Sequence, residues 1–316
     1  MDLLNIIWNP DPVMFYIGER GIRWYGFLLA FGFLLGYLIL SRVMKKEGNK
    51  QELIDKLAIY VIVGVVVGLR LGHCFFYNPG YYFSHPLEIL YVWEGGLASH
   101  GGAVGILIAV GIFAFRKKIS YLGLLDRIVL IVPLAGGMVR IGNLMNSEIL
   151  GIPTKFPLAF KFLRNHEDLL PAINASGGNC QVTDLNCLAD YWVARHPTQL
   201  YEAIFYFIMF LVFFAIYKKY ISKWEPGTFL GWFVTVLFVF RYLIEFSKVD
   251  QVEFDGWTDA IRMGQLLSIP FILIGYLLLD WGYGLIIFRR YRQKKEVEEK
   301  QISGLDKKGS ENKKNK

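Results

Sequence analysis

Both the fold and the chemistry of this chain are indicated by one stretch, Ile128-Val-Leu-Ile-Val-Pro-Leu-Ala-Gly-Gly-Met-Val-Arg140-Ile-Gly-Asn143-Leu-Met-Asn146-Ser-Glu148. Its first part is an apolar run, and its last part carries an arginine, two asparagines and a glutamate. Placing an arginine at the centre of a membrane helix costs from about 2.5 kcal/mol upward. Such residues usually face a bundle interior or a wet cavity and mark function. The stretch therefore predicts a membrane span that ends in a functional site.

The composition also favours a membrane protein. Of the 316 residues, 54% are hydrophobic and 16% are aromatic, and the mean hydropathy is +0.37. This profile is too apolar for a single soluble domain. The formal net charge of +7 does not indicate nucleic acid as a partner, because the basic residues lie in short loops and in the tail. The first residues show no basic region and no small-residue cleavage site, so we expect no removed signal peptide.

Seven apolar runs are each about long enough to cross a hydrocarbon core of about 30 Å. They cover residues 22–41, 54–76, 96–115, 128–147, 198–217, 228–246 and 265–288. Lysines and arginines follow the first, third, fifth and seventh runs, whereas residues 77–94 contain none. The positive-inside rule then places the N-terminus outside and the C-terminus inside. The predicted fold is an all-α membrane protein, a bundle of about seven transmembrane helices with a periplasmic loop domain.

Two segments stand apart from the apolar runs. Residues 148–197 form the longest outside connection, and a loop of this length is usually a lid or a substrate-contacting domain. It contains Cys180 and Cys187, which would lie in an oxidising space where a disulfide can form. We therefore expect a seven-span catalytic domain over residues 1–292, with this periplasmic insertion included. Residues 293–316 are expected to form a disordered basic cytoplasmic tail.

Polar residues recur at the outer ends of the predicted spans. They are Tyr25, Arg70, His100, Arg140, Asn143, His196, Gln199, Tyr201, Glu202, Arg241, Glu245, Gly264 and Gln265. Alternate spans cross the membrane in opposite directions. Residues near the start of some spans and near the end of others therefore lie at one depth. The inner ends carry only lysines and arginines that reach the interface. The pattern therefore predicts one polar chamber near the outer surface.

Spacing refines this chamber. Arg140, Asn143 and Asn146 step by three and lie on one helix face. Arg241 and Glu245 are four residues apart and can pair. Structural explanations stand beside these: the Arg241–Glu245 pair can serve the bundle alone, and each asparagine can be an interhelical hydrogen bond worth about 0.6 kcal/mol.

The other polar positions have structural alternatives as well. His100 can be a packing histidine, and Arg70 can reach a lipid headgroup from within the bundle. The neighbouring glycines are more simply packing sites than parts of a substrate site, and they are Gly95, Gly96, Gly101, Gly102 and Gly105.

The residue types favour chemistry on a phosphate. Inward-facing arginines offer a rigid donor fork, and a histidine at the same depth can accept or donate a proton near neutral pH. Neither a nucleophile elbow nor an acidic cluster for two metals is apparent, and no CxxC or His/Cys ligand spacing occurs. The residues alone indicate metal-free chemistry on a phospholipid headgroup at the outer surface of a bacterial cytoplasmic membrane.

Three motifs resemble the bacterial prolipoprotein diacylglyceryl transferase family. They are Gly95-Gly-Leu-Ala-Ser-His100-Gly-Gly, the stretch Arg140–Glu148 and Arg195-His196-Pro-Thr-Gln-Leu-Tyr201-Glu202-Ala. The start Arg23-Trp-Tyr25-Gly, the run Arg241-Tyr-Leu-Ile-Glu245-Phe and Met263-Gly264-Gln265 agree in order and spacing. The resemblance covers nearly all of residues 5–288.

The resemblance implies a reaction. A diacylglyceryl group would pass from phosphatidylglycerol to the lipobox cysteine thiol of a prolipoprotein, with release of glycerol 1-phosphate, as the first step of lipoprotein maturation. It implies no metal and no cofactor. The implied partners are phosphatidylglycerol, signal peptides of prolipoproteins and membrane lipids. The implied location is the bacterial cytoplasmic (inner) membrane, with several spans and an active site toward the periplasm.

The resemblance also implies residue roles. Arg140 would contact the lipid phosphate, Arg241 would polarise it, and His100 would be the base for the thiol, although a carboxylate could also take that proton. Substrate-orienting roles fall on Tyr25, Asn143, Asn146, Glu148 and Glu245.

The chain departs from the family in two places. After Glu245 the family often continues with a Phe-Arg-Glu-Pro-Asp-like stretch, whereas this chain reads Phe246-Ser-Lys248-Val-Asp250, which makes the second basic residue weak or shifted. The insertion around 159–194 is longer than usual. The residues alone also leave open a lipid or anion transporter, which predicts broken helices or paired halves, another lipid transferase, or a scaffold. The sequence shows neither sign of a transporter.

Overall fold

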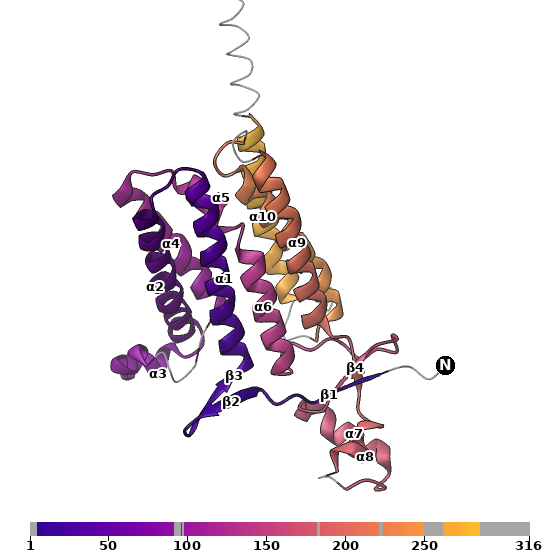
Figure 1. Ribbon diagram of the computed structural model, residues 1–316. Helices are drawn as coiled ribbons and strands as arrows, with labels where there is room; N and C mark the ends of the chain where they lie inside the picture. Colours follow the sequence, from indigo (N-terminus) through magenta and orange to yellow (C-terminus); the bar gives the residue numbers. More distant parts are fainter. Residues whose placement is uncertain are drawn as a thin grey trace, which may run out of the picture.

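The computed structural model describes residues 5–91, 96, 98–181, 184–220, 224–249 and 262–284. Long helices stand side by side, and a smaller unit of strands and short helices extends from one end of them (Figure 1). The tail predicted at 293–316 lies outside the described residues.

Within the described residues, six single helices are long and apolar enough to cross a membrane, and a bent pair forms a further span. The single helices are α1 (Trp24–Lys46), α2 (Gln51–Phe76), α4 (Ser99–Lys117), α9 (Thr198–Tyr220), α10 (Thr228–Ile244) and Met263–Gly284. The bent pair is α5 (Tyr121–Ile128) and α6 (Val132–Met145). These spans overlap the seven apolar runs, so the prediction of an all-α multi-span membrane protein is confirmed.

The remaining described elements are short. The strands are β1 (Ile6–Trp8), β2 (Val13–Ile17), β3 (Arg20–Arg23), β4 (Phe160–Phe162) and β5 (Ala194–Arg195). The short helices are α3 (Pro79–Ser84), η1 (Pro86–Leu90), η3 (His166–Asp168), α7 (Leu169–Ser176), α8 (Leu185–Ala189) and η5 (Glu245–Ser247).

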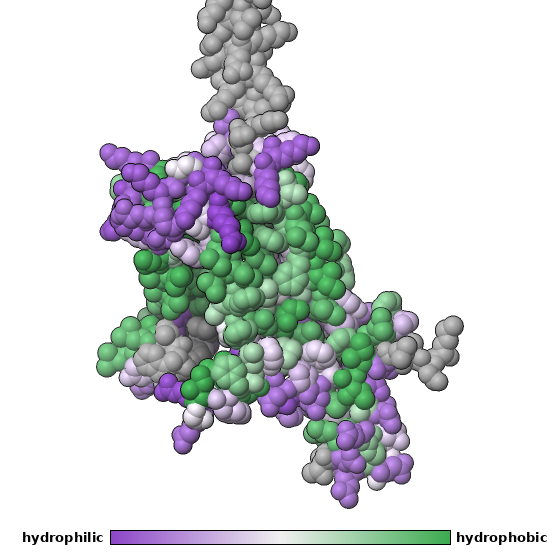
Figure 2. All heavy atoms as spheres, viewed as in Figure 1, coloured by the Kyte–Doolittle hydropathy of each residue, from purple (hydrophilic) through white to green (hydrophobic). Residues whose placement is uncertain are grey.

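An apolar belt separates two polar ends of the molecule (Figure 2). Outward side chains on the long helices stay exposed in the isolated chain, as expected for a surface that faces lipid. One end carries the basic residues that close α1, α4 and α9, namely Lys45, Lys46, Arg116, Lys117, Lys218 and Lys219. We call this end the basic side and the opposite end the insertion side.

The fourth span differs from the single run predicted at 128–147. It begins at Tyr121 and bends by 44° between α5 and α6. Pro133 lies in the first turn of α6, where it cannot donate to the carbonyl four residues before it. The expectation that the chain contains no broken helix was therefore wrong. The bend lies on the basic side, at the opposite end of α6 from Arg140.

Glycines bring α2 and α4 into backbone contact. A Cβ atom on Gly101 would collide with the Gly68 carbonyl and lie 2.7 Å from the Gly72 Cα atom. A Cβ atom on Gly105 would collide with the Gly64 carbonyl in the same way. Small residues at such positions let two membrane helices approach closely, so Gly101 and Gly105 are packing glycines.

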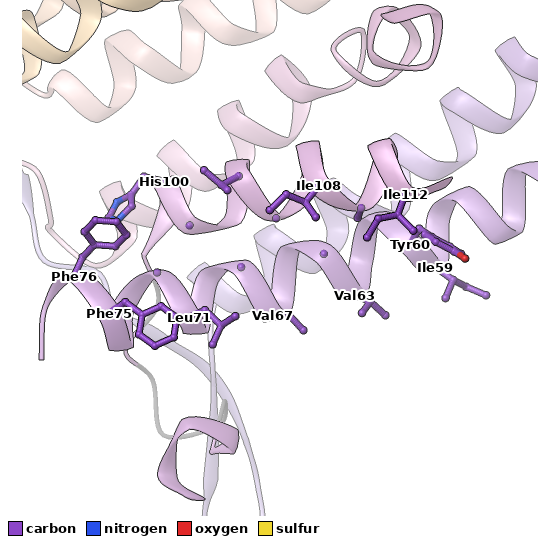
Figure 3. A pocket seen from close by; sticks show the side chains of 17 residues that line it. Ile59, Tyr60, Val63, Val67, Leu71, Phe75, Phe76, His100, Ile108 and Ile112 are labelled. Atoms are coloured by element: carbon purple, nitrogen blue, oxygen red, sulfur yellow. The ribbon is translucent and has the colours of Figure 1, made fainter. Parts of the chain in front are cut away.

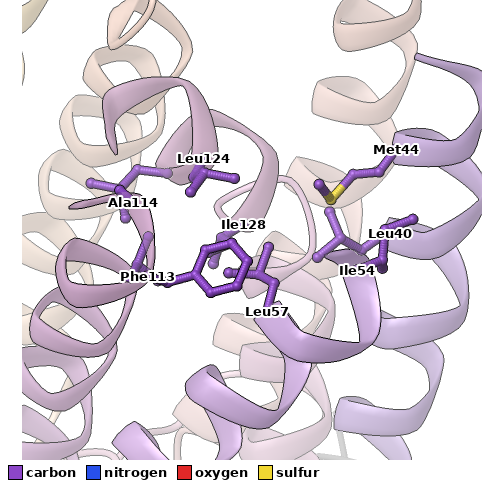
Figure 4. Close-up of a cluster of buried hydrophobic side chains, with 10 residues drawn as sticks. Leu40, Met44, Ile54, Leu57, Phe113, Ala114, Leu124 and Ile128 are labelled. Atoms are coloured by element: carbon purple, nitrogen blue, oxygen red, sulfur yellow. The ribbon is translucent and has the colours of Figure 1, made fainter. Parts of the chain in front are cut away.

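Four helices meet in an apolar core on the basic side (Figure 4). Leu40 of α1, Leu57 of α2, Phe113 of α4 and Ile128 of α5 are all nearly fully buried in one cluster. This core fixes α5 between α1 and α4. As a result, the span that carries Arg140 begins in a well-packed part of the bundle.

The insertion side contains a small sheet and the predicted loop domain. β1 pairs in parallel with β4, and β4 pairs antiparallel with β5. Cys180 and Cys187 form a disulfide, and Cys180 packs with Trp192 in a separate apolar cluster. The disulfide that the sequence allowed is therefore present. The sheet was not predicted, because its strands have two or three residues and lie outside the apolar runs.

Candidate active site

A buried glutamate lies at the centre of a charged cluster on the insertion side. Glu202, near the start of α9, is fully buried. Its Oε2 lies 3.2 Å from Arg140 Nε, and its Oε1 accepts a hydrogen bond of 2.9 Å from Lys248 Nζ. Lys248 Nζ also lies 3.7 Å from Glu245 Oε2. Because buried charges must be paired to be tolerated, these contacts hold α6, α9 and the segment after α10 together.

The end of α6 folds back on itself around Glu148. Asn143 and Asn146 donate amide hydrogen bonds of 3.0 and 3.1 Å to the two carboxylate oxygens of Glu148. The backbone can turn this way because Ser147 and Ile149 have φ angles of 54° and 59°, which non-glycine residues seldom adopt. Glu148 itself is exposed on the insertion side, so the amides hold an accessible carboxylate in place.

Arg140 connects the ion pairs around Glu202 to the hydrogen bonds around Glu148. Its Nη1 donates to Asn143 Oδ1 at 3.4 Å, and it also hydrogen bonds to the Tyr206 hydroxyl. Gln199 of α9 donates to the Glu148 backbone carbonyl at 2.5 Å. The predicted common face of Arg140, Asn143 and Asn146 is thus used, since all three turn toward α9 or Glu148.

Tyr25 approaches the cluster from α1. A Cβ atom on Gly142 would lie 3.0 Å from the Tyr25 Cα atom, so only a glycine lets the first turn of α1 reach α6 here. Tyr25 then interacts electrostatically with Glu148 and Arg140. The structure therefore brings the Tyr25 phenol close to Arg140 and Glu148, with which the sequence analysis had grouped it.

Arg241 is the exception among the cations of the cluster. It lies half-buried on α10 and interacts electrostatically with Tyr206. The pair that Arg241 and Glu245 could form is not made. α10 ends at Ile244, and Glu245 begins the 3₁₀ turn η5, where side chains three apart face each other. Glu245 accordingly pairs with Lys248, and Arg241 has no hydrogen bond or ion pair within the part of the chain that the structure describes.

Lys248, the basic residue that the sequence comparison described as weak or shifted, belongs to the cluster. Lys248 is 5% exposed. Burial lowers the pKa of Lys248, whereas the attraction of Glu202 opposes that shift. Arg262 donates to the backbone carbonyls of Glu245 and Lys248, and Gly264 lies against the Glu245 carboxylate. The last helix therefore starts at the cluster, as the Gly264-Gln265 pattern predicted.

His100 lies elsewhere. It is exposed at the insertion-side end of α4, with its ring centroid 5.2 Å from Phe76 and 6.0 Å from Tyr77. It closes one end of an apolar groove of about 730 Å³ between α2 and α4 (Figure 3). α6 packs instead on α1 and α9, so no described contact joins His100 to Arg140. The role of His100 as a base stays a prediction.

Arg70 and His196 hold loops. Arg70 is 3% exposed and donates to the backbone carbonyls of Glu88 and Ile89 at 2.5 and 3.0 Å, so it does not reach a headgroup. The Nδ1 atom of His196 lies 3.2 Å from the Tyr201 hydroxyl. Over the described residues, no group of three or more His, Cys, Asp or Glu side chains is arranged to hold a metal ion.

Sequence reasoning did not assign roles to Glu202, Lys248 or Arg262. Glu202 carried a usable signal, because a carboxylate near the start of an apolar span must find a partner. Lys248 and Arg262 flank the polar connection between the last two spans, and nothing in the local sequence distinguishes them from surface cations.

Comparison with known proteins identifies the family of this chain. A family model described as prolipoprotein diacylglyceryl transferase matches residues 12–281. A phosphatidylglycerol–prolipoprotein diacylglyceryl transferase of Chloroherpeton thalassium is 43% identical over 275 residues, covering 87% of this chain and 93% of that protein. Proteins of the same name from Tolumonas auensis and Bacteroides fragilis are 39% and 37% identical, covering 87% and 89% of this chain and 96% of each relative. The resemblance predicted from the motifs is confirmed.

Proposed function

This chain belongs to the prolipoprotein diacylglyceryl transferase family, and we propose that its buried cation cluster carries out the transfer. The substrates are phosphatidylglycerol and the lipobox cysteine of a prolipoprotein signal peptide. The products are a diacylglyceryl thioether and glycerol 1-phosphate. The enzyme acts in the bacterial cytoplasmic membrane with its insertion side toward the periplasm, because the basic residues of the opposite end favour the cytoplasm.

The reaction breaks one bond and forms one. The cysteine sulfur attacks the diacylglycerol carbon that bears the phosphate, and the bond between that carbon and the phosphate oxygen breaks. The electron pair leaves with glycerol 1-phosphate, and the thiol proton passes to a base. A thiol has a pKa near 8.5, so removal of its proton is required for attack. Stabilising the leaving phosphate is the other requirement.

Arg241 is the observation that carries this proposal. Arg140 and Lys248 are held by Glu202, whereas Arg241 has no carboxylate partner among the described residues. A guanidinium kept unpaired beside fixed charges can take a phosphate with a bidentate hydrogen bond. Preorganised charge of this kind, where water is scarce, stabilises a developing anion strongly. Arg140, which is paired with Glu202, would contact the same phosphate.

Two groups can serve as the thiol base. Glu148 lies in the cluster, exposed and oriented by Asn143 and Asn146. His100 lies at the end of the α2–α4 groove, beside any acyl or peptide chain that occupies it. The replacements Glu148→Gln and His100→Gln distinguish the two candidates. In the variant that has lost the base, kcat should reach its maximum only at higher pH, where the thiol loses its proton without help. The other variant should keep the pH dependence of the wild type.

The direct experiment uses purified protein, phosphatidylglycerol and a lipobox peptide. Glycerol 1-phosphate and lipidated peptide should appear in equal amounts, with no added metal and in the presence of a chelator. Phosphatidylethanolamine in place of phosphatidylglycerol is the control lipid. Protein that forms neither product, yet moves lipid across vesicles, would contradict the proposal and favour a transporter, which the bend between α5 and α6 would suit.

A further inference from the structure

A buried ion pair joins the insertion to the sheet. Asp168, at the end of η3, is 1% exposed, and Arg195 of β5 is 9% exposed. Arg195 donates from Nε to Asp168 Oδ2 at 2.8 Å and from Nη2 to Oδ1 at 2.6 Å. Asn165 adds a hydrogen bond of 2.8 Å to Asp168 Oδ2. This two-pronged geometry fixes both the distance and the angle between the two side chains.

The same arginine also reaches the loop that follows Glu148. Its Nη1 donates to the Gly151 carbonyl at 3.3 Å. The backbone of Gly151 donates to the His196 carbonyl at 3.1 Å, and His196 donates to the Ile152 carbonyl at 3.2 Å. The segment at 150–152 therefore runs alongside the chain that leaves β5, without forming a strand of its own.

The other side of this segment leads to Lys248. Gly151 pairs antiparallel with Lys248. Ile152 donates to the Ser247 carbonyl at 3.0 Å, and Val249 donates to the Leu150 carbonyl at 3.1 Å. An unbroken path of backbone and side-chain hydrogen bonds thus runs from Asp168 to the cation that pairs with Glu202.

The path is tightly packed at Gly151. A Cβ atom on Gly151 would lie 2.6 Å from His196 Cβ and 2.9 Å from Thr198 Cγ2. We therefore expect a shift of Arg195 to move the segment at 150–152, because Gly151 packs tightly against His196, the residue that follows Arg195. Glu148 precedes this segment by two residues and Lys248 is bridged to it, so we expect both to move with it.

We propose that Asp168 is a positioning residue, which acts through Arg195 and the segment at 150–152 to place Glu148 and Lys248 in the cluster. This inference rests on the proposed function. Stability alone explains the pair poorly, because a buried ion pair is often no more stabilising than apolar residues of the same volume. What the pair supplies is a defined geometry between the insertion and the cluster.

The test compares three variants in the transfer assay. Asp168→Asn keeps the side chain's shape but removes its charge, and Arg195→Lys keeps the charge but removes the two-pronged contact. Both should lower kcat on the order of 10- to 100-fold, as misplacement of catalytic groups does, while the KM for phosphatidylglycerol changes little. Asp190→Asn, an exposed carboxylate in the same insertion, is the matched control and should retain wild-type kcat.

Two measurements distinguish a loss of positioning from a loss of folding. Thermal unfolding and an intact Cys180–Cys187 disulfide report whether each variant folds; if Asp168→Asn does not fold, Arg195→Lys decides. Wild-type kcat in a folded Asp168→Asn or Arg195→Lys enzyme would overturn the positioning role, and so would a loss confined to KM. Wild-type and Asp190→Asn proteins that both lack transfer activity would instead contradict the proposed function.

Discussion

Cations of the same charge play different parts in this site because their partners differ. Arg140 and Lys248 share the buried carboxylate of Glu202, so part of their charge is already neutralised by the protein. Arg241 is near them without such a partner in the described chain. At the scale of single residues, this difference separates groups that build the site from the group that is ready for a ligand.

Replacing Arg241 should abolish chemistry without unfolding the protein. We expect Arg241→Ala to lower kcat/KM on the order of 10²- to 10³-fold, the usual effect of losing one preorganised donor. Its thermal stability should stay near that of the wild type, because no described carboxylate loses a partner. Arg116→Ala, at the basic end of α4, is the control and should be fully active. An active Arg241→Ala enzyme would remove the central residue of the proposed mechanism.

The burial of Lys248 should appear in the pH profile. Its pKa lies below the ordinary lysine value because burial disfavours the charged form. As pH rises, Lys248 therefore loses its charge before exposed lysines do, and the cluster loses a cation. Lys248→Arg keeps its charge throughout, so the ratio of its kcat/KM to that of the wild type should rise with pH. A ratio that stays constant from neutral to alkaline pH would show that the charge of Lys248 does not limit the reaction.

Sequence reasoning found much of this site. Tyr25, Arg140, Asn143 and Glu245 were predicted to share one depth, and the structure brings them together. Hydropathy could show this because a polar residue in an apolar span is costly wherever it lies. It could not show partners, since the pairing of Glu245 with Lys248 rather than Arg241 depends on where α10 gives way to a 3₁₀ turn.

At the scale of elements, the spans were predictable and their contacts were not. Hydrophobic length alone gave the helices to within several residues. The bend at Val129–Ile131 was missed because Pro133 was read as part of a continuous apolar run. His100 and Arg140 were placed in one chamber on depth alone, but depth does not say which helices are neighbours. α4 packs on α2, whereas α6 packs on α1 and α9.

The backbone contact between α2 and α4 gives a test of its own. Gly101→Ala adds a methyl group that would collide with the Gly68 carbonyl. We expect a loss of about 1–3 kcal/mol, typical of overpacking, measured by thermal unfolding in detergent. Gly111→Ala lies on the same helix, and its nearest neighbour is the Tyr121 ring at 3.7 Å. This control should be neutral or slightly stabilising, since alanine favours helix. Equal stability of the two variants would argue against a tight interface.

At the scale of the whole molecule, the proposed function requires that the insertion and the cluster face the periplasm. Cysteines introduced at Tyr16, which is 67% exposed on the insertion side, and at Lys117 on the basic side can be labelled in intact cells. A membrane-impermeant maleimide should modify Tyr16→Cys directly and Lys117→Cys only after permeabilisation. The native Cys74 is buried, and the other two cysteines form a disulfide. The reverse labelling pattern would invert the proposed orientation.

The central claim is that cations from separate helices bind the phosphate of a lipid substrate at the Glu202 cluster. A structure of the wild-type protein in phosphatidylglycerol nanodiscs tests it most directly. We expect the lipid phosphate within hydrogen-bonding distance of the Arg241 and Arg140 guanidinium groups, with its glycerol headgroup toward the insertion side. A phosphate bound only at the basic side, or in the α2–α4 groove away from both arginines, would contradict the account.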